Sequence, residues 1–323
     1  MKNMQYRAFV AGGIREEMER DERVFLMGQG VQAGGSYGTC EGLFNHFGPE
    51  RVRDTPISED SVVGCALGAA ITGMRPIVEI LYCDFALRAM DQIVNQVAKY
   101  RYMSGGRMSV PLVIRTACGY GASRGAQHSQ SLEATFFHFP GLKIVVPSSA
   151  VNAKGLLKSA VRDDNPVIIM ESFLFYGTSG PVPEEEYTTP LGKAEVKREG
   201  KDITLLAVSA MVSQAMKAAE ALAGEGIDVE VIDPLTLVPL DMETIVDSVR
   251  KTNRLLVVEG GPKRGGVGSE IISSVVEEAF DYFDCPPSRL AIPNVPIPFS
   301  SKMEGLVLPG SLSIAKEIRR MLG

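Results

Sequence analysis

Short apolar runs alternate with longer segments of helical periodicity along the first half of the chain. The runs are bounded by glycine, proline or charged residues, which is typical of strands buried in a sheet. Strands are therefore expected at Val24–Gly28, Pro76–Leu81, Val110–Arg115, Lys143–Pro147 and Pro166–Glu171. Helices are expected at Tyr6–Asp21, Ala86–Tyr102 and Asn152–Arg162. Short apolar strands separated by helices indicate a parallel sheet that helices cover on both faces.

A stretch rich in proline and acidic residues, 180–187, interrupts this alternation and reads as a linker. A second alternating unit follows it. Its strands are expected at Asp202–Val208, Val229–Asp233 and Arg254–Glu259, and its helices at Ser213–Ala223, from Asp241, at Gly268–Phe283 and from Ser311. The predicted fold is thus α/β, with two doubly wound domains of mainly parallel strands. We place these domains at residues 1–190, with a linker at about 178–195, and at residues 196–323.

Composition narrows the class of protein. A chain of 323 residues can bury two cores, and its net charge of −6 without a Lys/Arg cluster argues against a nucleic-acid partner. The cysteines are odd in number and form no CxxC pair, so a reducing compartment is expected and a zinc site is not: Cys40, Cys65, Cys83, Cys118 and Cys285. No apolar run of membrane-spanning length or signal-peptide core occurs, which favours a cytoplasmic protein without a membrane partner.

Glu59 is the candidate site residue that the pattern singles out. It opens a helix, 59–73, that has very few polar side chains, so we expect most of the helix circumference to be buried and Glu59 to lie where water is scarce. Burial raises a carboxyl pKa and makes proton exchange near neutrality feasible. In the alternative interpretation, Ser58 caps the helix and Glu59 only complements its positive end.

Two glycine-rich loops are further candidates for function. The segment 260–268 follows a strand and opens a helix, the context for binding an anion, but it lacks the GK[ST] end of a phosphate loop. A tight turn or a subunit contact is the favoured interpretation there. The segment 119–125 is a candidate mobile loop that precedes His128.

Five segments carry a family resemblance, and they occur in the family's order: Thr55–Glu59, Gly73–Glu79, Asp91–Gln96, Tyr100–Gly106 and Ala126–Ser131. Together they resemble the beta subunit of the thiamine-diphosphate-dependent component of 2-oxoacid dehydrogenase complexes, which has a transketolase-like fold. The acetoin dehydrogenase complex has a closely similar subunit. The likeness covers nearly the whole chain.

The resemblance implies roles for three residues at the pyrimidine ring of thiamine diphosphate. Glu59 matches the glutamate that bonds to the ring and drives the proton shift that activates the cofactor, a role that suits a carboxyl group with a raised pKa. Phe85 falls where the family places an aromatic ring beside the pyrimidine, with plain core packing as the alternative. Gln29 stands where the family usually has a glutamate that touches the cofactor. A neutral amide there still forms hydrogen bonds but changes the local charge.

Histidine is rare in this sequence, and a lone histidine is usually structural. The resemblance nevertheless places His128 at the active-site entrance, as a proton donor or anion stabiliser during acyl transfer to a lipoyl group. His138 follows two phenylalanines and precedes a third, so we expect it in the core, and we expect His46 near a helix end.

The resemblance also implies ions. Relatives bind the diphosphate through Mg²⁺ that a Gly-Asp-Gly segment of the partner alpha subunit holds, and this sequence contains no Gly-Asp-Gly. Four positions match those at which relatives hold a structural potassium ion, mostly through backbone carbonyls: Leu112, Ala160, Asp163 and Asn165. An ordinary Asp-Asn-Pro turn after a helix is an equally good interpretation of these four.

The expected assembly follows from the resemblance. The chain would supply the pyrimidine half of the cofactor site and be inactive alone. It would form an α2β2 tetramer with the alpha subunit, with a contact between two beta subunits, and pass acyl groups to a lipoyl-bearing acyltransferase. The alternatives are the C-terminal half of a split transketolase-like enzyme that transfers a ketol unit, and a non-catalytic assembly module.

Overall fold

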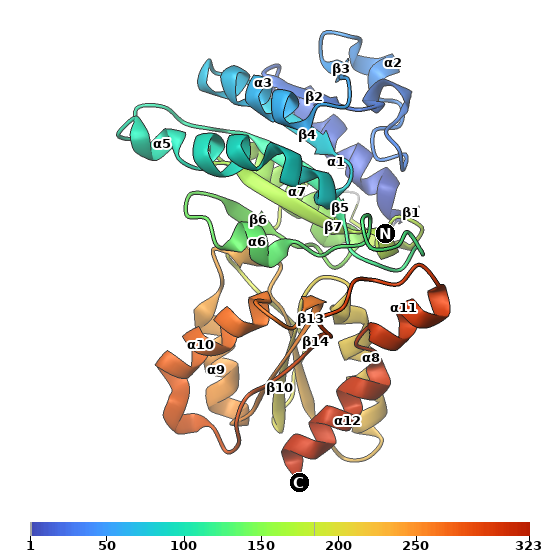
Figure 1. The fold of residues 1–323 in the computed structure, drawn as a ribbon, viewed down its shortest axis with the longest axis vertical. Coiled ribbons are helices and arrows are strands. Elements are labelled where there is room, and N and C mark those ends of the chain that lie inside the picture. The colour runs from blue at the N-terminus through green and yellow to red at the C-terminus, as the bar shows by residue number, and fades with distance from the viewer. Residues whose placement is uncertain (1, 184) are drawn as a thin grey trace. The chain divides into compact units, whose positions relative to one another are not determined.

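The computed structural model describes residues 2–183 and 185–323 and divides the chain into two compact units (Figure 1). The first unit comprises residues 1–118 and 135–191, and the second comprises residues 119–134 and 192–323. Residues 119–134 therefore group with the second unit, although they precede the boundary expected near residue 190. Each unit contains a mainly parallel sheet with helices, so the predicted α/β fold is confirmed.

The sheet of the first unit places β6, β7, β5, β4, β2 and β3 side by side in this order, all parallel. The strands are β2 (Val24–Gly28), β3 (Val52–Asp54), β4 (Arg75–Ile80), β5 (Val113–Cys118), β6 (Lys143–Val145) and β7 (Val167–Ser172). Every residue of β2, β5 and β7 is buried, as expected for strands that are covered on both faces. The register sets Gly28 beside Glu79 and Glu79 beside Arg115.

Along the chain, the helices of the first unit precede, separate or follow these strands. They are α1 (Tyr6–Arg20), η1 (Val31–Ala33), α2 (Leu43–Phe47), α3 (Glu59–Ile71), α4 (Cys83–Ala86), η2 (Leu87–Ala89), η3 (Asp91–Val97), α5 (Tyr100–Met103), α6 (Glu133–Phe137, which spans the division between the units), α7 (Ala150–Arg162) and η4 (Phe173–Phe175). The helix α1 packs against α7, and α3 packs against β4 and η3. The helices predicted at Tyr6–Asp21 and Asn152–Arg162 are confirmed to within two residues as α1 and α7.

The continuous helix predicted for Ala86–Tyr102 is wrong. The segment is divided among α4, η2, the π-helix η3 and α5. In η3 the N–H of Ala98 reaches back to the carbonyl of Ile93, five residues earlier, which is the hydrogen bond of a wide turn. The wider turn keeps Ile93, Val97 and Ala98 buried together, a spacing that an ordinary helical pattern does not predict.

Two boundaries also differ from the prediction. The strand β5 starts at Val113 rather than at Val110, because Pro111 has no N–H to donate to a sheet. The first part of the predicted linker is a strand, β8 (Ser179–Val182), which pairs antiparallel with β1 (Lys2–Gln5). Glu184, within the predicted linker, lies outside the described residues.

The sheet of the second unit has the order β14, β13, β10, β11, β9, in which only β9 is antiparallel to its neighbour. The strands of this unit are β9 (Glu195–Arg198), β10 (Ile203–Ala207), β11 (Val229–Asp233), β12 (Thr236–Val238), β13 (Leu255–Pro262) and β14 (Ser288–Ile292). The helices are α8 (Met211–Ala223), α9 (Met242–Thr252), α10 (Val267–Ala279), η5 (Phe280–Tyr282), α11 (Ser301–Val307) and α12 (Ser311–Leu322). The pattern did not predict β9, β12, β14 or α11.

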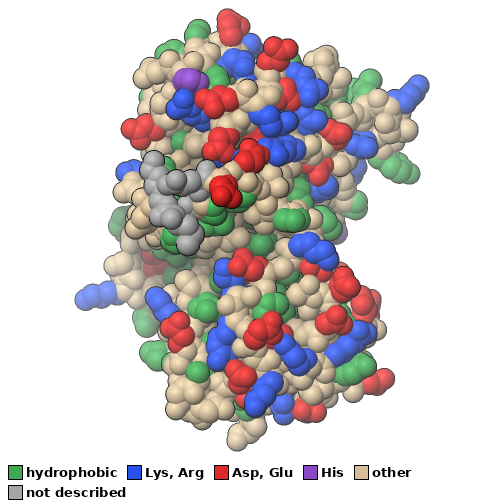
Figure 2. All heavy atoms as spheres, turned by 180° about the vertical axis from the view of Figure 1, so that it is seen from behind, with side chains coloured by type: hydrophobic (Ala, Val, Ile, Leu, Met, Phe, Trp, Pro, Cys, Tyr) green, Lys and Arg blue, Asp and Glu red, His purple; other side chains and the backbone are tan. Residues whose placement is uncertain are grey.

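The surface carries both signs of charge. On the face shown in Figure 2, Lys and Arg side chains are interspersed with Asp and Glu side chains, and the described residues there form no large patch of one sign. Within the described part of the chain, no helix combines the length and apolar character that crossing a membrane requires.

Candidate active site

Glu59 is the first residue of α3, and its side chain is half-buried. Ser58 occupies the N-cap position, but its side chain accepts no capping hydrogen bond. The Ser58 hydroxyl instead lies within hydrogen-bonding distance of the Asp60 carboxylate (3.3 Å) and of the Ser61 hydroxyl (3.2 Å). The interpretation in which Ser58 caps the helix is therefore wrong, whereas the position of Glu59 does let the helix dipole favour its negative charge.

The helix α3 buries only one face. The buried residues are Val62, Val63, Ala66, Leu67 and Ala70. The exposed face carries small side chains: Ser61, Cys65 and Gly68. The expectation that most of the circumference is buried is thus wrong for this chain by itself. Because the exposed side chains are short, another element could approach this face closely.

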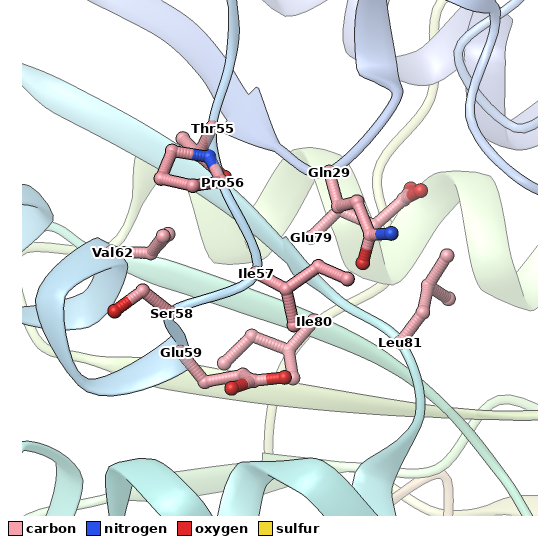
Figure 3. A pocket seen from close by; sticks show the side chains of 10 residues that line it. All are labelled: Gln29, Thr55, Pro56, Ile57, Ser58, Glu59, Val62, Glu79, Ile80 and Leu81. Atoms are coloured by element: carbon pink, nitrogen blue, oxygen red, sulfur yellow. The ribbon is translucent and has the colours of Figure 1, made fainter.

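A shallow pocket lies beside Glu59 (Figure 3). Its wall consists of the loop 55–59, Val62 and the residues at the carboxyl ends of β2 and β4: Gln29, Glu79, Ile80 and Leu81. Gln29 and Glu59 bring polar groups to a wall that is otherwise largely apolar. The volume is about 20 Å³, which accommodates roughly one water molecule. This chain therefore offers one wall of a ligand site rather than an enclosed chamber.

Behind this wall lies a buried ionic cluster that sequence reasoning missed. The Arg115 guanidinium on β5 bonds to Glu79 on β4 at 2.8 Å and to Glu171 on β7 at 2.8 and 3.1 Å. Thr39 and Cys40 donate to the same Glu79 oxygen, and burial and the Glu79 charge raise the pKa of the Cys40 thiol. The available signal was an ionisable residue in each of three adjacent strands that are otherwise almost entirely apolar.

The other Glu79 oxygen, Oε1, is buried without a hydrogen-bond partner. A buried acceptor without a partner is costly unless a ligand or water donates to it. The pocket wall itself combines the polar ends of Gln29 and Glu59 with the apolar side chains of Ile57 and Ile80. This combination fits a heteroaromatic ring that carries amino groups, such as the pyrimidine of thiamine diphosphate.

Phe85 does not line this pocket. Its ring is half-buried on α4, with its centroid 6.0 Å from that of Tyr82. Phe85 lies four residues beyond Leu81, which does line the pocket. The structure thus places Gln29 and Glu59 at one pocket. Phe85 instead contacts Tyr82, which follows the pocket residue Leu81 in the sequence.

His128 belongs to the second unit, in a segment without helix or strand between β5 and α6. We call residues 119–130 the His128 loop. The N–H of Gly119 donates to the carbonyl of Gln130 at 2.8 Å and so closes the base of the loop. His128 is half-buried, and its N–H lies 3.4 Å from the carbonyl of Gly125.

A cavity of about 190 Å³ adjoins the His128 loop within the second unit. One side of it is formed by residues 129–132, and the other by segments near Gly260 and 295–297. The Ser129 hydroxyl, which is buried, has no hydrogen-bond partner. The walls are mainly apolar, which sequence reasoning did not predict.

The two remaining histidines differ from each other. His138 is exposed, so its predicted place in the core is wrong. The residue contacts Phe139 edge-on, but Phe136 is the member of this aromatic group that is buried. His46 lies in the last turn of α2, as expected for a helix end, and its ring nitrogen is 3.1 Å from Glu19.

At three of the four predicted potassium positions, the oxygens already have hydrogen-bond partners. The carbonyls of Leu112 and Ala160 accept hydrogen bonds from Val167 and Asp163. The carbonyl of Asp163 accepts one from the Arg75 guanidinium at 3.0 Å. The Asp163 carboxylate binds Lys143 and accepts from Asn165, and these bonds hold the pKa of Asp163 below its usual range despite partial burial.

The glycine-rich segment 260–268 packs around the carboxyl group of Glu259. The carboxylate of Glu259 accepts the N–H of Gly268 at 3.2 Å, at the start of α10. A Cβ at Gly266 would lie 2.5 Å from that carboxylate, so only glycine fits there. Glu259 thus occupies the place that a bound phosphate would take, which agrees with the interpretation as a tight turn. Among the residues that the structure describes, no group of three or more His, Cys, Asp or Glu side chains could hold a metal ion.

Comparison with known proteins connects these features. The profile of the transketolase pyrimidine-binding domain matches residues 2–176, and that of the transketolase C-terminal domain matches residues 192–314. The chain is 46% identical, over 99% of its length and 86% of the relative, to the pyruvate dehydrogenase E1 component subunit beta-2, mitochondrial, of Oryza sativa subsp. japonica. It is 46% identical to the pyruvate dehydrogenase E1 component subunit beta of Rickettsia felis, over 95% of each chain. A solved structure described as a split gene transketolase, inactive beta4 tetramer, is similar in fold, with a TM-score of 0.81, 23% identity and coverage of 99% of this chain and 98% of that one.

Proposed function

Because this chain belongs to the family of pyruvate dehydrogenase E1 component beta subunits, we propose that it is the beta subunit of a thiamine-diphosphate-dependent dehydrogenase of pyruvate-type 2-oxoacids. The observation that carries the proposal is the identity of 46% over 99% of the chain, together with the place of Glu59 at the pocket wall. With an alpha subunit it would cleave the carbon–carbon bond next to a carbonyl and transfer the acyl group to lipoamide.

The pocket residues divide the work at the cofactor. Bound thiamine diphosphate supplies the nucleophilic carbon that attacks the substrate carbonyl. Glu59 would hold a proton at the pyrimidine ring, and the helix start behind it stabilises the carboxylate when that proton moves. Gln29 would donate a hydrogen bond without adding charge beside Glu79. Phe85 would provide apolar surface at the edge of the ring.

The oxygen ligands that this chain offers decide where we place the two metal ions. The alpha subunit would hold Mg²⁺ and the diphosphate, since this sequence has no Gly-Asp-Gly segment and the pocket wall carries no Lys or Arg side chain for the diphosphate. Potassium would sit on the carbonyls of Leu112 and Ala160 and on the oxygens of Asp163 and Asn165. Each carbonyl oxygen has a second lone pair, so the ion would share the Asp163 carbonyl with Arg75.

The proposed partners account for surfaces that the chain leaves open. An alpha subunit would close the pocket and cover the face of α3 at Ser61, Cys65 and Gly68, in an α2β2 assembly with a contact between beta subunits. A lipoyl-bearing acyltransferase would present its arm to His128. We also propose a cytoplasmic location, supported by the likeness to bacterial relatives, which cell fractionation would test.

The test is reconstitution with an alpha chain that contains a Gly-Asp-Gly segment. Glu59→Gln should fold and bind the cofactor, yet reduce 2-oxoacid turnover by about 100-fold or more, because an essential proton transfer is lost. Asp60→Asn is the matched control, since Asp60 is the exposed neighbour on the same helix turn. Turnover of Glu59→Gln equal to that of Asp60→Asn would refute the proposed role.

Substrate choice needs a separate comparison. Pyruvate, branched-chain 2-oxoacids and acetoin should be compared with a ketose phosphate as donors. The proposal expects the highest kcat/KM with pyruvate. Ketol transfer is favoured only by a fold likeness at 23% identity. It would become the better reading if only the ketose phosphate reacted.

A further inference from the structure

We propose that Glu304 is a positioning residue that holds the His128 loop in shape for acyl transfer to the lipoyl arm. The inference rests on the role proposed for His128. It concerns contacts within the second unit alone, between the loop 119–130 and the helix α11.

The backbone of the His128 loop adopts left-handed φ values at several positions, one of which is not a glycine. Gly119, Gly121 and Gly125 have φ values of +88°, +98° and +73°, and Ser123 lies in the same left-handed region at φ 51°. Glycine adopts this region readily, but serine does so only when surrounding contacts compensate the strain. Contacts with residues outside the loop must therefore hold its backbone in this conformation.

Glu304 supplies such contacts. One oxygen of its carboxylate accepts the N–H of Gly121 at 2.7 Å, and the other accepts the N–H of Ser123 at 3.3 Å. The side chain is 4% exposed, so these charge-assisted hydrogen bonds are protected from water. A single carboxylate thus fixes the two backbone amides on either side of Ala122.

The helix α11 anchors this carboxylate next to a second contact. The Phe299 ring, just before the helix, would lie 3.6 Å from a Cβ at Gly125. Glu304 therefore constrains the loop at 121–123, and Phe299 packs where the chain approaches His128. Together with the closing bond from Gly119 to Gln130, these contacts leave His128 little freedom to change its direction.

The proposal makes a specific kinetic claim. If Glu304 acts only through His128, its loss should impair the step that uses His128 and spare the cleavage step, in which Glu59 acts. A side chain that merely stabilised the second unit would instead lower both rates together.

The experiment uses Glu304→Gln in the reconstituted α2β2 protein. The substitution keeps size but places an NH2 group against one of the two backbone amides. Hydrogen exchange of peptides within 119–130 should accelerate. Reductive acylation of a lipoyl domain should fall about 10- to 100-fold, while turnover with an artificial electron acceptor stays within about twofold. Glu277→Gln, an exposed position on α10, is the control and should change neither.

A double variant isolates the pathway. With His128→Ala, adding Glu304→Gln should cause little further loss of lipoyl transfer, because the two residues act as one unit. Unchanged exchange at 119–130, equal loss of both activities, or additive losses in the double variant would each overturn the proposal. A His128→Ala variant with normal lipoyl transfer would refute the proposed role of His128 itself, a result that the single variant reports independently of Glu304.

Discussion

Glu259 is an acid whose surroundings oppose ionisation. It is 3% exposed, and burial raises its pKa to about 7, although the Gly268 N–H and Arg289 favour the charged form. Burial raises the pKa of Glu133 to about 7 as well, and the charge of Glu259 adds to that rise. In the unfolded chain a glutamate ionises near pH 4.3. Between these two pH values the folded protein holds a proton that the unfolded chain has released.

The sign of the resulting pH dependence follows from linkage. Because the folded state binds more protons, the free energy of unfolding falls as pH rises from about 4.3 to about 7. Above about pH 7 the whole destabilisation from ionising Glu259 is present. Glu259→Gln should therefore raise the free energy of unfolding at about pH 8, by at most about 4 kcal/mol, and change little near pH 4. Urea unfolding of the variant and the parent from about pH 4 to about pH 8 measures this difference in stability. A variant curve parallel to that of the parent would contradict the assignment.

His128 has a prediction of its own. His128→Ala should retain most of the turnover with an artificial electron acceptor and lose most of the transfer to a lipoyl domain. The opening dithiolane sulfur develops negative charge and needs a proton or a cation near it. Both rates should be measured on one preparation of the variant and compared with those of the parent. Equal losses would point to substrate binding, and no loss in either assay would return His128 to a structural role.

Among the elements, α7 shows how close packing reverses an ordinary helix rule. Gly155 lies inside α7, where alanine usually stabilises a helix by about 1 kcal/mol. A Cβ there would lie 2.2 Å from the Thr189 hydroxyl oxygen and 3.0 Å from its backbone nitrogen. The segment that follows β8 is thus held directly against α7, and no side chain fits between them.

We therefore predict opposite outcomes for two glycine substitutions. Gly155→Ala should destabilise the first unit by about 1–3 kcal/mol through overpacking. Gly12→Ala is the matched control, because Gly12 lies inside α1 with nothing within 4 Å of a Cβ. That change should be neutral or stabilise by up to about 1 kcal/mol. Thermal unfolding of both variants provides the comparison, and a stabilising Gly155→Ala would show that Thr189 can move away.

At the scale of the whole molecule, the proposed alpha subunit would cover two features that this chain leaves open. The pocket beside Glu59 is open, and the small-residue face of α3 is bare. Calorimetry on the isolated chain should detect no tight, magnesium-dependent binding of thiamine diphosphate, and binding should appear once the alpha subunit is added. Tight binding by this chain alone would overturn the assembly proposed for it.

Cysteine labelling reports the same assembly without relying on activity. Cys65 is exposed on α3, whereas Cys40, Cys83 and Cys118 are buried. In a Cys285→Ser background, a maleimide should react with Cys65 in the isolated chain and much more slowly in the complex. Equal rates in both would mean that the alpha subunit does not cover α3.

Local pattern was sufficient for much of the fold. The apolar run at Val24–Gly28 and the helical period from Tyr6 depend on neighbours a few residues away, and both elements formed as expected. Glu59 also lies at the start of its helix as predicted, since a helix start is a local feature. The family motifs pointed to Gln29 and Glu59, and the parallel pairing of β2 and β4 brings Gln29 beside the Glu79–Leu81 segment at the pocket wall.

Only the tertiary structure decided which distant residues meet. Glu79, Arg115 and Glu171 form one buried cluster because three strands align in a particular register, and no local period encodes a register. The wide turns of η3, the pairing of β8 with β1 and the exposure of His138 likewise depend on what packs against them. The His128 loop belongs to the second unit, where Glu304, far along the chain, accepts hydrogen bonds from its backbone amides. Sequence alone thus indicated most of the elements and the residue types available for chemistry, because these depend on neighbours along the chain. Long-range contacts decided which of those residues lie together.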